Sequence, residues 1–179
     1  RQDMNKNAAD RDSVQQINAS NSPRGTMEAV FQGNLTLDFA GQEAINTICS
    51  SMTFVGRSMK RVLITSCRAN EGKTFIALQI AIGMTRRGKK VLLIDGDLRM
   101  SVLRSQYNIR LSGSSFGLAH LISGQCTLDQ AIYATNIPNL YLMPDGTSVK
   151  TPLSLLTSAE FGAMMNALNE SRSEERRVG

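Results

Sequence analysis

The sequence has few of the residues that build metal-bound or disulfide-bonded scaffolds. Its 179 residues include three cysteines and one histidine, and no two cysteines form a C-x-x-C pair. Structural zinc sites need about four cysteine or histidine ligands, and disulfide frameworks need paired cysteines. These shortages argue against both kinds of scaffold and favour a reducing compartment.

Long apolar runs and dense basic stretches are also missing. No apolar run reaches the ~18 residues of a membrane-spanning helix, and the N-terminus lacks the apolar core of a signal peptide. The formal net charge is +5, but no Lys/Arg stripe interleaved with aromatics stands out, so we expect no nucleic-acid partner. A hydrophobic share of 41% at this length suits one domain with a sizeable core.

The two ends of the chain differ from its middle. Residues 1–34 are rich in Asn, Asp, Ser, Gln and Arg without periodicity, which predicts a disordered arm or linker. Residues 172–179 read RSEERRVG, which matches codon for codon the in-frame translation of a common sequencing adapter. We therefore expect an artefact there, with the natural sequence ending near Ser171; a charged, solvated helix end is the alternative. The domain is expected over residues 35–171.

Strand-like and helix-like segments alternate through the middle of the chain. Short β-branched or apolar runs predict buried strands at Arg61–Ser66, Val91–Ile94 and Leu140–Met143. Helical patterns are expected over residues 38–55, 75–85, 117–123, 128–134, 152–157 and 158–168. This alternation predicts an α/β fold in three layers, with a doubly wound, mostly parallel sheet covered on both faces and incomplete at its C-terminus.

Residues 65–74 read TSCRANEGKT, between a predicted strand and a predicted helix. That is the context of the phosphate-binding P-loop G-x-x-x-x-G-K-[ST], whose backbone N–H groups point at phosphate oxygens. Lys73 would place a positive charge at the β- and γ-phosphates, and the Thr74 hydroxyl would bind Mg²⁺. Cys67 stands at the first glycine position, and Asn70 stands where related loops carry glycine; Asn tolerates the left-handed region. A chance EGKT in an ordinary turn is the alternative.

A second motif, VLLIDGDLR, places two carboxylates after the next predicted strand. Ligands of open α/β sheets sit outside the carboxyl ends of strands, so Asp95 and Asp97 should lie near the P-loop. They could hold Mg²⁺ or accept a proton, although D-G-D also suits a simple polar turn. We expect catalysis by Lys73, Asp95 and Asp97, and metal binding by Thr74, Asp95 and Asp97. The nucleotide, ATP, is expected to contact Arg68, Ala69, Asn70, Glu71, Gly72, Lys73, Thr74, Phe75 and Arg99.

Together, residues 66–74 and 92–99 resemble the Walker A and Walker A′ motifs of the bacterial tyrosine kinases of capsule and exopolysaccharide systems. Phe116–Ala134 and Ile137–Leu156 look like segments of that family in order and spacing, so the resemblance covers roughly Asp38 to Asn169. It implies a P-loop domain that uses ATP and Mg²⁺ to phosphorylate tyrosines, including those of its own copies. It also implies that Asp95 is the base or a metal-linked carboxylate and that Asp97 supports the metal.

The resemblance further implies a homo-oligomer and a transmembrane activator that regulates polysaccharide chain length. Through that partner the protein would lie in the cytoplasm at the inner face of the plasma membrane. Two departures matter. The family's E-x-x-R-x-x-R oligomerisation helix retains only Glu43, because Asn46 and Cys49 replace the arginines, and this argues against ring formation. The Walker B strand and a terminal tyrosine cluster are absent, so we expect a domain truncated before Walker B and poorly active.

Two other functions stay open from the sequence. An ATPase switch of the partition or division-site type would bind ATP and dimerise without phosphorylating protein. That group carries a signature lysine after the first loop glycine, where this chain has Arg68. The D-x-D-x-R motif favours the kinase, whereas the missing arginines weaken it. The third alternative is a nucleotide-binding module without catalysis, which the degenerate loop would suit.

Overall fold

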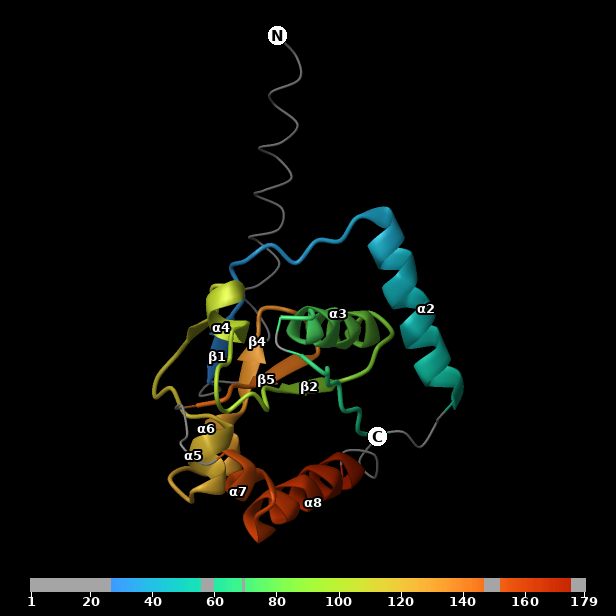
Figure 1. Cartoon of the computed structure of the whole chain (residues 1–179). Helices are drawn as coiled ribbons and strands as arrows, with labels where there is room; N and C mark the ends of the chain where they lie inside the picture. Colours follow the sequence, from blue (N-terminus) through green and yellow to red (C-terminus); the bar gives the residue numbers. More distant parts are fainter. Residues whose placement is uncertain (1–26, 56–59, 69, 147–151, 175–179) are drawn as a thin grey trace.

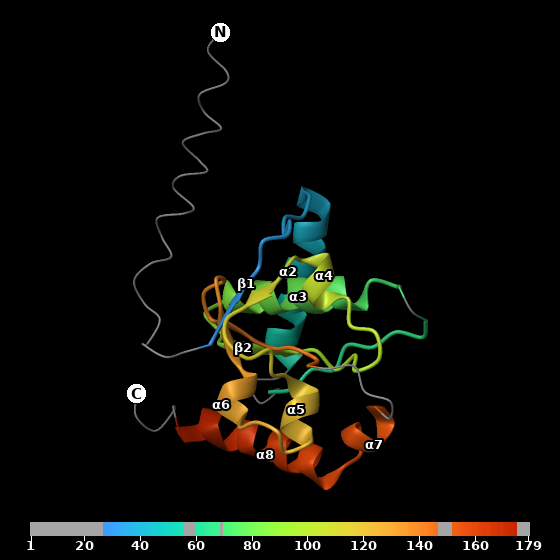
Figure 2. The same ribbon diagram turned by 90° about the vertical axis from the view of Figure 1, so that its left-hand side faces the viewer.

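The computed structural model describes residues 27–55, 60–68, 70–146 and 152–174. Helices α3 and α4 lie on one face of a central sheet and α5, α6, α7 and α8 on the other, while α2 packs against α3 (Figures 1 and 2). The expected three-layer α/β fold is therefore confirmed. No helix in these ranges is long and apolar enough to cross a membrane.

The elements follow one another as β1 (Glu28–Val30), α2 (Phe39–Val55), α3 (Lys73–Thr85), β2 (Val91–Ile94), α4 (Leu103–Gln106), β3 (Arg110–Leu111), α5 (Leu118–Ile122), α6 (Leu128–Ala131), β4 (Tyr133–Thr135), β5 (Leu140–Met143), α7 (Pro152–Leu156) and α8 (Ala159–Glu174).

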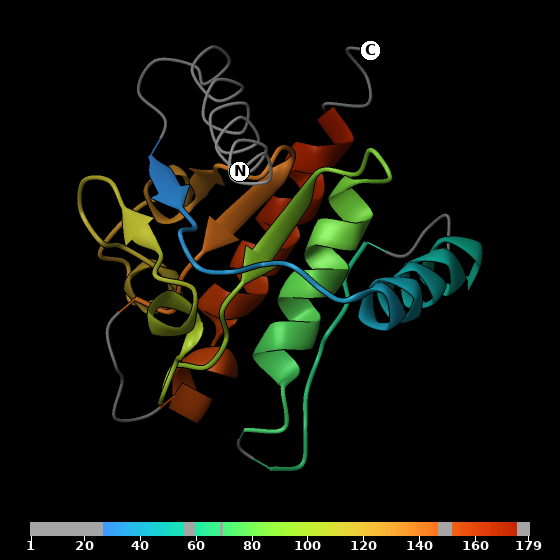
Figure 3. The ribbon, with the colours of Figure 1, turned by 90° about the horizontal axis from the view of Figure 1, so that it is seen from above.

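The sheet is mixed, in the order β2-β5-β4-β1-β3 (Figure 3). β2 runs parallel to β5 and β1 parallel to β4, whereas the β4–β5 and β1–β3 pairs are antiparallel. The β2–β5 register runs from Val91 opposite Leu140 to Ile94 opposite Met143. Because the two parallel strands end together, the residues that follow them meet at one edge of the sheet.

Side chains of β2 alternate between the two cores, as the two-residue period of a strand requires. Val91 and Leu93 pack into the core beneath α3, and Leu92 and Ile94 pack into the core formed with α5, α6 and α8. A strand buried on both faces needs apolar residues at every position, which explains the uninterrupted run VLLI.

Helix α3 packs against the sheet through one face and against α2 through another. Leu78, Ala81 and Ile82 belong to the core over the sheet, and Ile80 packs with Ile45 and Cys49 of α2. The contact with α2 is tight at a glycine: a Cβ atom on Gly83 would lie 2.7 Å from Cys49 Sγ. The expected helices here are confirmed.

The expected buried strand at Arg61–Ser66 is wrong. Residues 60–66 have no regular secondary structure, Leu63 is 89% exposed and Val62 is 52% exposed. A strand needs a neighbour with free backbone groups, and no described strand pairs with this segment. Of the apolar residues in this segment, Ile64 packs against the core cluster between α2 and α3.

The N-terminal boundary also differs from the expectation. Residues 27–34 were expected in the arm, yet β1 lies between β3 and β4, with Ala29 and Phe31 buried. The expected helix over 128–134 ends at Ala131 because Tyr133–Thr135 forms β4. Residues 172–174 of the adapter-like tail continue α8, whereas 1–26 and 175–179 lie outside the described residues.

Candidate phosphate-binding and acidic site

The start of α3 has the backbone form of a phosphate-binding loop. Gly72 is the N-cap and adopts a left-handed conformation, φ 84°, and Asn70 also has a positive φ of 62°. No side chain caps the helix, and a Cβ atom on Gly72 would meet nothing within 4 Å. The first N–H groups of α3 therefore have no side-chain cap and lie at the positive end of the helix dipole, an arrangement that suits phosphate oxygens.

The loop before Gly72 is held by its own side chains. The Arg68 N–H donates to Glu71 Oε2 at 3.1 Å, and the Ser66 hydroxyl donates to the Arg68 carbonyl at 2.8 Å. Glu71 thus turns back onto the loop backbone instead of projecting toward the helix start. Ala69 lies outside the described residues, so its expected contact with nucleotide stays a prediction.

The structure brings the P-loop lysine and the acidic motif together. Lys73 Nζ lies 3.1 Å from Asp97 Oδ2, and both side chains are about two-thirds buried, with 33% and 29% exposed. Thr74 and Phe75, half-buried, complete the first turn of α3. Two motifs that are 24 positions apart therefore form one site at the carboxyl end of β2.

Asp95 is fixed on both of its carboxylate oxygens. Oδ1 accepts a hydrogen bond from the Asp97 N–H at 3.1 Å, and Oδ2 accepts one from the Ser101 hydroxyl at 2.5 Å. Its own N–H donates to the Met143 carbonyl, which continues the β2–β5 ladder. Burial raises the pKa of Asp95, and the hydrogen bonds from Ser101 and Asp97 only partly offset that effect.

The pKa of Asp97 is shifted in the opposite direction. Partial burial alone would raise its pKa, but hydrogen bonds from the Met100 N–H and Lys73, together with the Lys73 charge, outweigh burial and lower the pKa. Two neighbouring carboxyl groups with opposite shifts suit different tasks, one binding a proton more readily and one remaining ionised. Arg99 is exposed in the turn after Asp97, and its backbone N–H also donates to that carboxylate.

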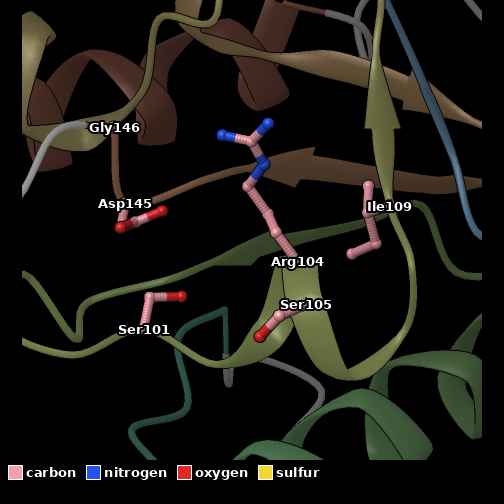
Figure 4. A pocket seen from close by; sticks show the side chains of 6 residues that line it. All are labelled: Ser101, Arg104, Ser105, Ile109, Asp145 and Gly146. Carbon is pink, nitrogen blue, oxygen red and sulfur yellow. The ribbon is translucent and has the colours of Figure 1, made fainter.

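The structure adds residues that the sequence interpretation missed. Asp145 follows β5 as Asp95 follows β2, and its pKa is raised by burial and then by the charge of Asp95. Ser101, which holds Asp95, and Asp145 also line an open surface pocket of about 390 Å³ (Figure 4). The run LYLM followed by P-D could have indicated Asp145 by the same strand-end rule that indicated Asp95.

The donor set suits a Mg²⁺ ion that is bound mainly through phosphate and water. Within the described ranges no group of three or more His, Cys, Asp and Glu side chains could enclose a metal. Mg²⁺ in nucleotide sites commonly uses one or two carboxylates, with phosphates and waters as the other ligands. Thr74, Asp95 and Asp97, beside an uncapped helix start, fit that pattern.

Comparison with known proteins places the chain among bacterial kinases. A family model described as an AAA domain matches residues 59–171. The tyrosine-protein kinase CpsD of Streptococcus agalactiae is 35% identical over 127 residues, which are 71% of this chain and 55% of that protein. The tyrosine-protein kinase YwqD of Bacillus subtilis is 34% identical over 118 residues, 65% of this chain and 48% of that protein.

Solved structures agree with the sequence comparison. The chimerical protein CapA2B2 superposes with a TM-score of 0.65 at 28% identity, covering 72% of this chain and 56% of that one. The chain belongs to the bacterial tyrosine kinase family. The kinase domain of the Escherichia coli tyrosine kinase ETK has the same TM-score, 0.65, at 23% identity over 73% of this chain and 51% of that one, a likeness of fold alone.

Membership of the bacterial tyrosine kinase family implies the use of a nucleotide. The chain spans about half the length of the curated relatives that it matches, 55% for CpsD and 48% for YwqD.

Proposed function

We propose that the protein is an ATP-dependent protein-tyrosine kinase, acting on its own copies among other substrates, that regulates capsule or exopolysaccharide biosynthesis. One observation carries the proposal: the 3.1 Å contact between Lys73 of the P-loop and Asp97 of the acidic motif, in a chain of this family. That contact joins a phosphate-binding helix start to carboxylates, the two parts that phosphoryl transfer needs.

Each part of the site has a task in this proposal. The N–H groups of the first α3 turn hold the phosphates, and Lys73 neutralises charge at the γ-phosphate. ATP supplies the phosphoryl group, whose bond to the β-phosphate oxygen breaks as a bond to the tyrosine oxygen forms. Asp95, at the end of β2, is proposed either to take the proton of the tyrosine hydroxyl or to hold the metal as a carboxylate ligand.

Thr74, Asp95 and Asp97 are the residues that would hold Mg²⁺, which would supply positive charge to neutralise the transferred group. The remaining predicted loop contacts, Arg68, Ala69, Asn70, Glu71, Gly72 and Phe75, would surround the phosphates, with Arg99 at the rim. The kinase domain is proposed over residues 35–171, together with β1, which is a strand of its sheet.

The proposed partner is a transmembrane activator of polysaccharide export, which would keep the protein in the cytoplasm at the inner face of the plasma membrane. Assembly with copies through α2 has little support in the sequence of that helix. Cys49, at the third position of the oligomerisation motif, is fully buried against α3, and Asn46 bonds to Glu43 on its own helix.

A comparison of two lysine variants tests the kinase. The cytosolic domain encoded by the uninterrupted gene is incubated with Mg·ATP, with and without the cytosolic segment of a membrane partner, and phosphotyrosine is mapped by mass spectrometry. Lys73→Met should abolish the signal, because the charge at the phosphates is lost. Lys89→Met is the matched control, since Lys89 is exposed beyond the other end of α3, and it should retain the parent signal.

The same experiment separates the alternatives. ATP turnover without phosphotyrosine would support the ATPase switch, and nucleotide binding without turnover would leave a binding module. Phosphotyrosine that persists in Lys73→Met would remove the P-loop from the mechanism.

A further inference from the structure

Ser101 lies between the acidic motif and helix α4, in the loop that follows β2. Its hydroxyl donates to Asp95 Oδ2 at 2.5 Å, across six positions of the chain. The same hydroxyl oxygen accepts a hydrogen bond from the Leu103 N–H at 3.4 Å. A serine hydroxyl has one hydrogen to donate, and here that hydrogen is directed to Asp95.

The position of this hydroxyl is set by the packing of the loop. Leu103, two residues further on, is 3% exposed and belongs to the core beneath α3. The first turn of α4 closes through a hydrogen bond from the Gln106 N–H to the Val102 carbonyl at 2.8 Å. Figure 4 shows Ser101 in the loop before α4 and Ser105 on the helix itself. Ser101 is therefore anchored to the core independently of its bond to Asp95.

The Asp95 carboxylate needs two donors to keep one orientation. The torsion that turns an aspartate carboxylate has broad, roughly two-fold preferences, so the backbone alone does not fix it. Oδ1 accepts the Asp97 N–H at 3.1 Å, while Oδ2 accepts the Ser101 hydroxyl. With both bonds each oxygen has its own donor. With the Asp97 N–H alone, the carboxylate could turn and exchange its oxygens.

The neighbouring carboxylate of Asp97 is held by other groups. Its Oδ2 lies 3.1 Å from Lys73 Nζ, and its Oδ1 accepts the Met100 N–H at 3.2 Å. Neither bond involves Ser101. Loss of the Ser101 hydroxyl should thus release Asp95 while the contact between Lys73 and Asp97 stays in place.

We propose that Ser101 is a positioning residue of the reaction, which acts by holding the Asp95 carboxylate in its working orientation beside the P-loop. The inference rests on the proposed kinase function and adds to it a residue outside both motifs. It applies whether Asp95 takes the proton or holds the metal, because both tasks need a carboxylate oxygen in a defined direction. The required group is the hydroxyl, so threonine should replace serine and alanine should not.

The kinetics of phosphotyrosine formation test this role in the cytosolic domain encoded by the uninterrupted gene. Ser101→Ala should lower kcat about 10- to 100-fold, the range of a hydrogen bond to a charged group. At saturating Mg²⁺ the KM for ATP should change little, because Lys73 and the start of α3 hold the phosphates. Ser101→Thr should recover most of the parent kcat.

Ser105→Ala is the matched control for the loss of a hydroxyl. Ser105 lines the same pocket as Ser101, but its hydroxyl donates to the Val102 carbonyl instead of to Asp95. This variant should keep the parent kcat and KM.

NMR spectroscopy of the whole chain gives a second measurement that needs no turnover. The Asp97 amide reports on the bond to Asp95, because an amide proton bonded to a carboxylate resonates downfield and exchanges slowly with solvent. Ser101→Ala should move this signal upfield and speed its exchange, whereas Ser101→Thr and Ser105→Ala should leave it in place. The Met100 amide, which donates to Asp97, is the internal reference and should not move.

The two measurements separate this inference from the proposed function. A shift of the Asp97 amide in Ser101→Ala but not in Ser101→Thr, in a protein that forms no phosphotyrosine, would support the positioning of Asp95 and reject the kinase. Phosphotyrosine formation with the parent kcat in Ser101→Ala would support the kinase and overturn the inference. An Asp97 amide that stays in place, or equal losses of kcat in Ser101→Ala and Ser101→Thr, would overturn it as well.

Discussion

Replacing Gly117 with alanine should strongly lower the stability of the fold. A Cβ atom there would lie 2.4 Å from the Pro144 carbonyl oxygen and 2.5 Å from the Gly146 nitrogen. Both are backbone atoms, so no side-chain rotation can relieve the clash. The N–H groups of Leu118 and Ala119 donate to the Pro144 and Asp145 carbonyls at 2.8 and 2.9 Å. Gly117→Ala must therefore push α5 away from the end of β5 and lengthen two hydrogen bonds.

The cost can be worked out from these contacts. Overpacking of a tight site costs about 1–3 kcal/mol, and the two weakened hydrogen bonds add about 1 kcal/mol each, which gives about 3–5 kcal/mol in total. For a chain of this length that corresponds to a melting temperature lower by roughly 6–20 °C.

Thermal unfolding followed by circular dichroism checks this value, with Gly162→Ala as the matched control. Gly162 is exposed within α8, and a Cβ atom there meets nothing within 4 Å. The control should therefore gain about 0.5–1 kcal/mol, because alanine loses less entropy than glycine in a helix. A Gly117→Ala variant that melts with the parent would refute the reasoning about the α5–β5 contact.

Three further predictions follow from the packing and the charges. Leu63→Ser should change the free energy of unfolding by less than about 0.5 kcal/mol in urea titration, because Leu63 is 89% exposed. A loss of several kcal/mol would instead support the expected buried strand at Arg61–Ser66. Gly83→Ala should destabilise by about 1–3 kcal/mol through Cys49 Sγ, and Cys49→Ala should relieve part of that loss in a double-mutant cycle; additive effects would contradict the contact. Because the folded pKa of Asp97 is lowered, its ion pair stabilises the fold above the unfolded pKa of about 3.9 and this is lost as pH falls further. Asp97→Asn should thus lower stability at pH 7, by less than about 1 kcal/mol, and the difference from the parent should vanish in acid.

The sequence predicted the elements whose apolar residues are buried on all sides. The run VLLI became β2, LYLM became β5, and the long apolar run after Lys73 became α3. RVLITS also contains an apolar run, VLI, but forms no strand, because pairing depends on a neighbour that the segment itself does not encode. β1 was missed for the converse reason: it has three residues, and its partners lie far along the chain, with Ala29 opposite Leu111.

Some residues of the site could likewise be predicted from the sequence, and others could not. Lys73 and Asp97 could be placed together because each follows from a motif with a known position in an α/β sheet. Ser101 and Asp145 belong to no motif, and they line one pocket only because the segments that follow β2 and β5 meet at one edge of the sheet. Asn70 was expected to tolerate the left-handed region, and it has a positive φ, since that tolerance belongs to the residue itself.

Strand β2, which leads into the acidic motif, pairs with β5 along one edge. Val91 and Asp95 donate to carbonyls on the β5 side, so the alternation of a parallel ladder directs the N–H groups of Leu92 and Ile94 to the opposite edge, where the described residues supply no strand. In heavy water these two amides should exchange faster than their neighbours, even though their side chains lie in a core. Opening of β2 would also carry Asp95 and Asp97 away from Lys73 as one unit, so the local stability of four residues sets how long the site stays assembled.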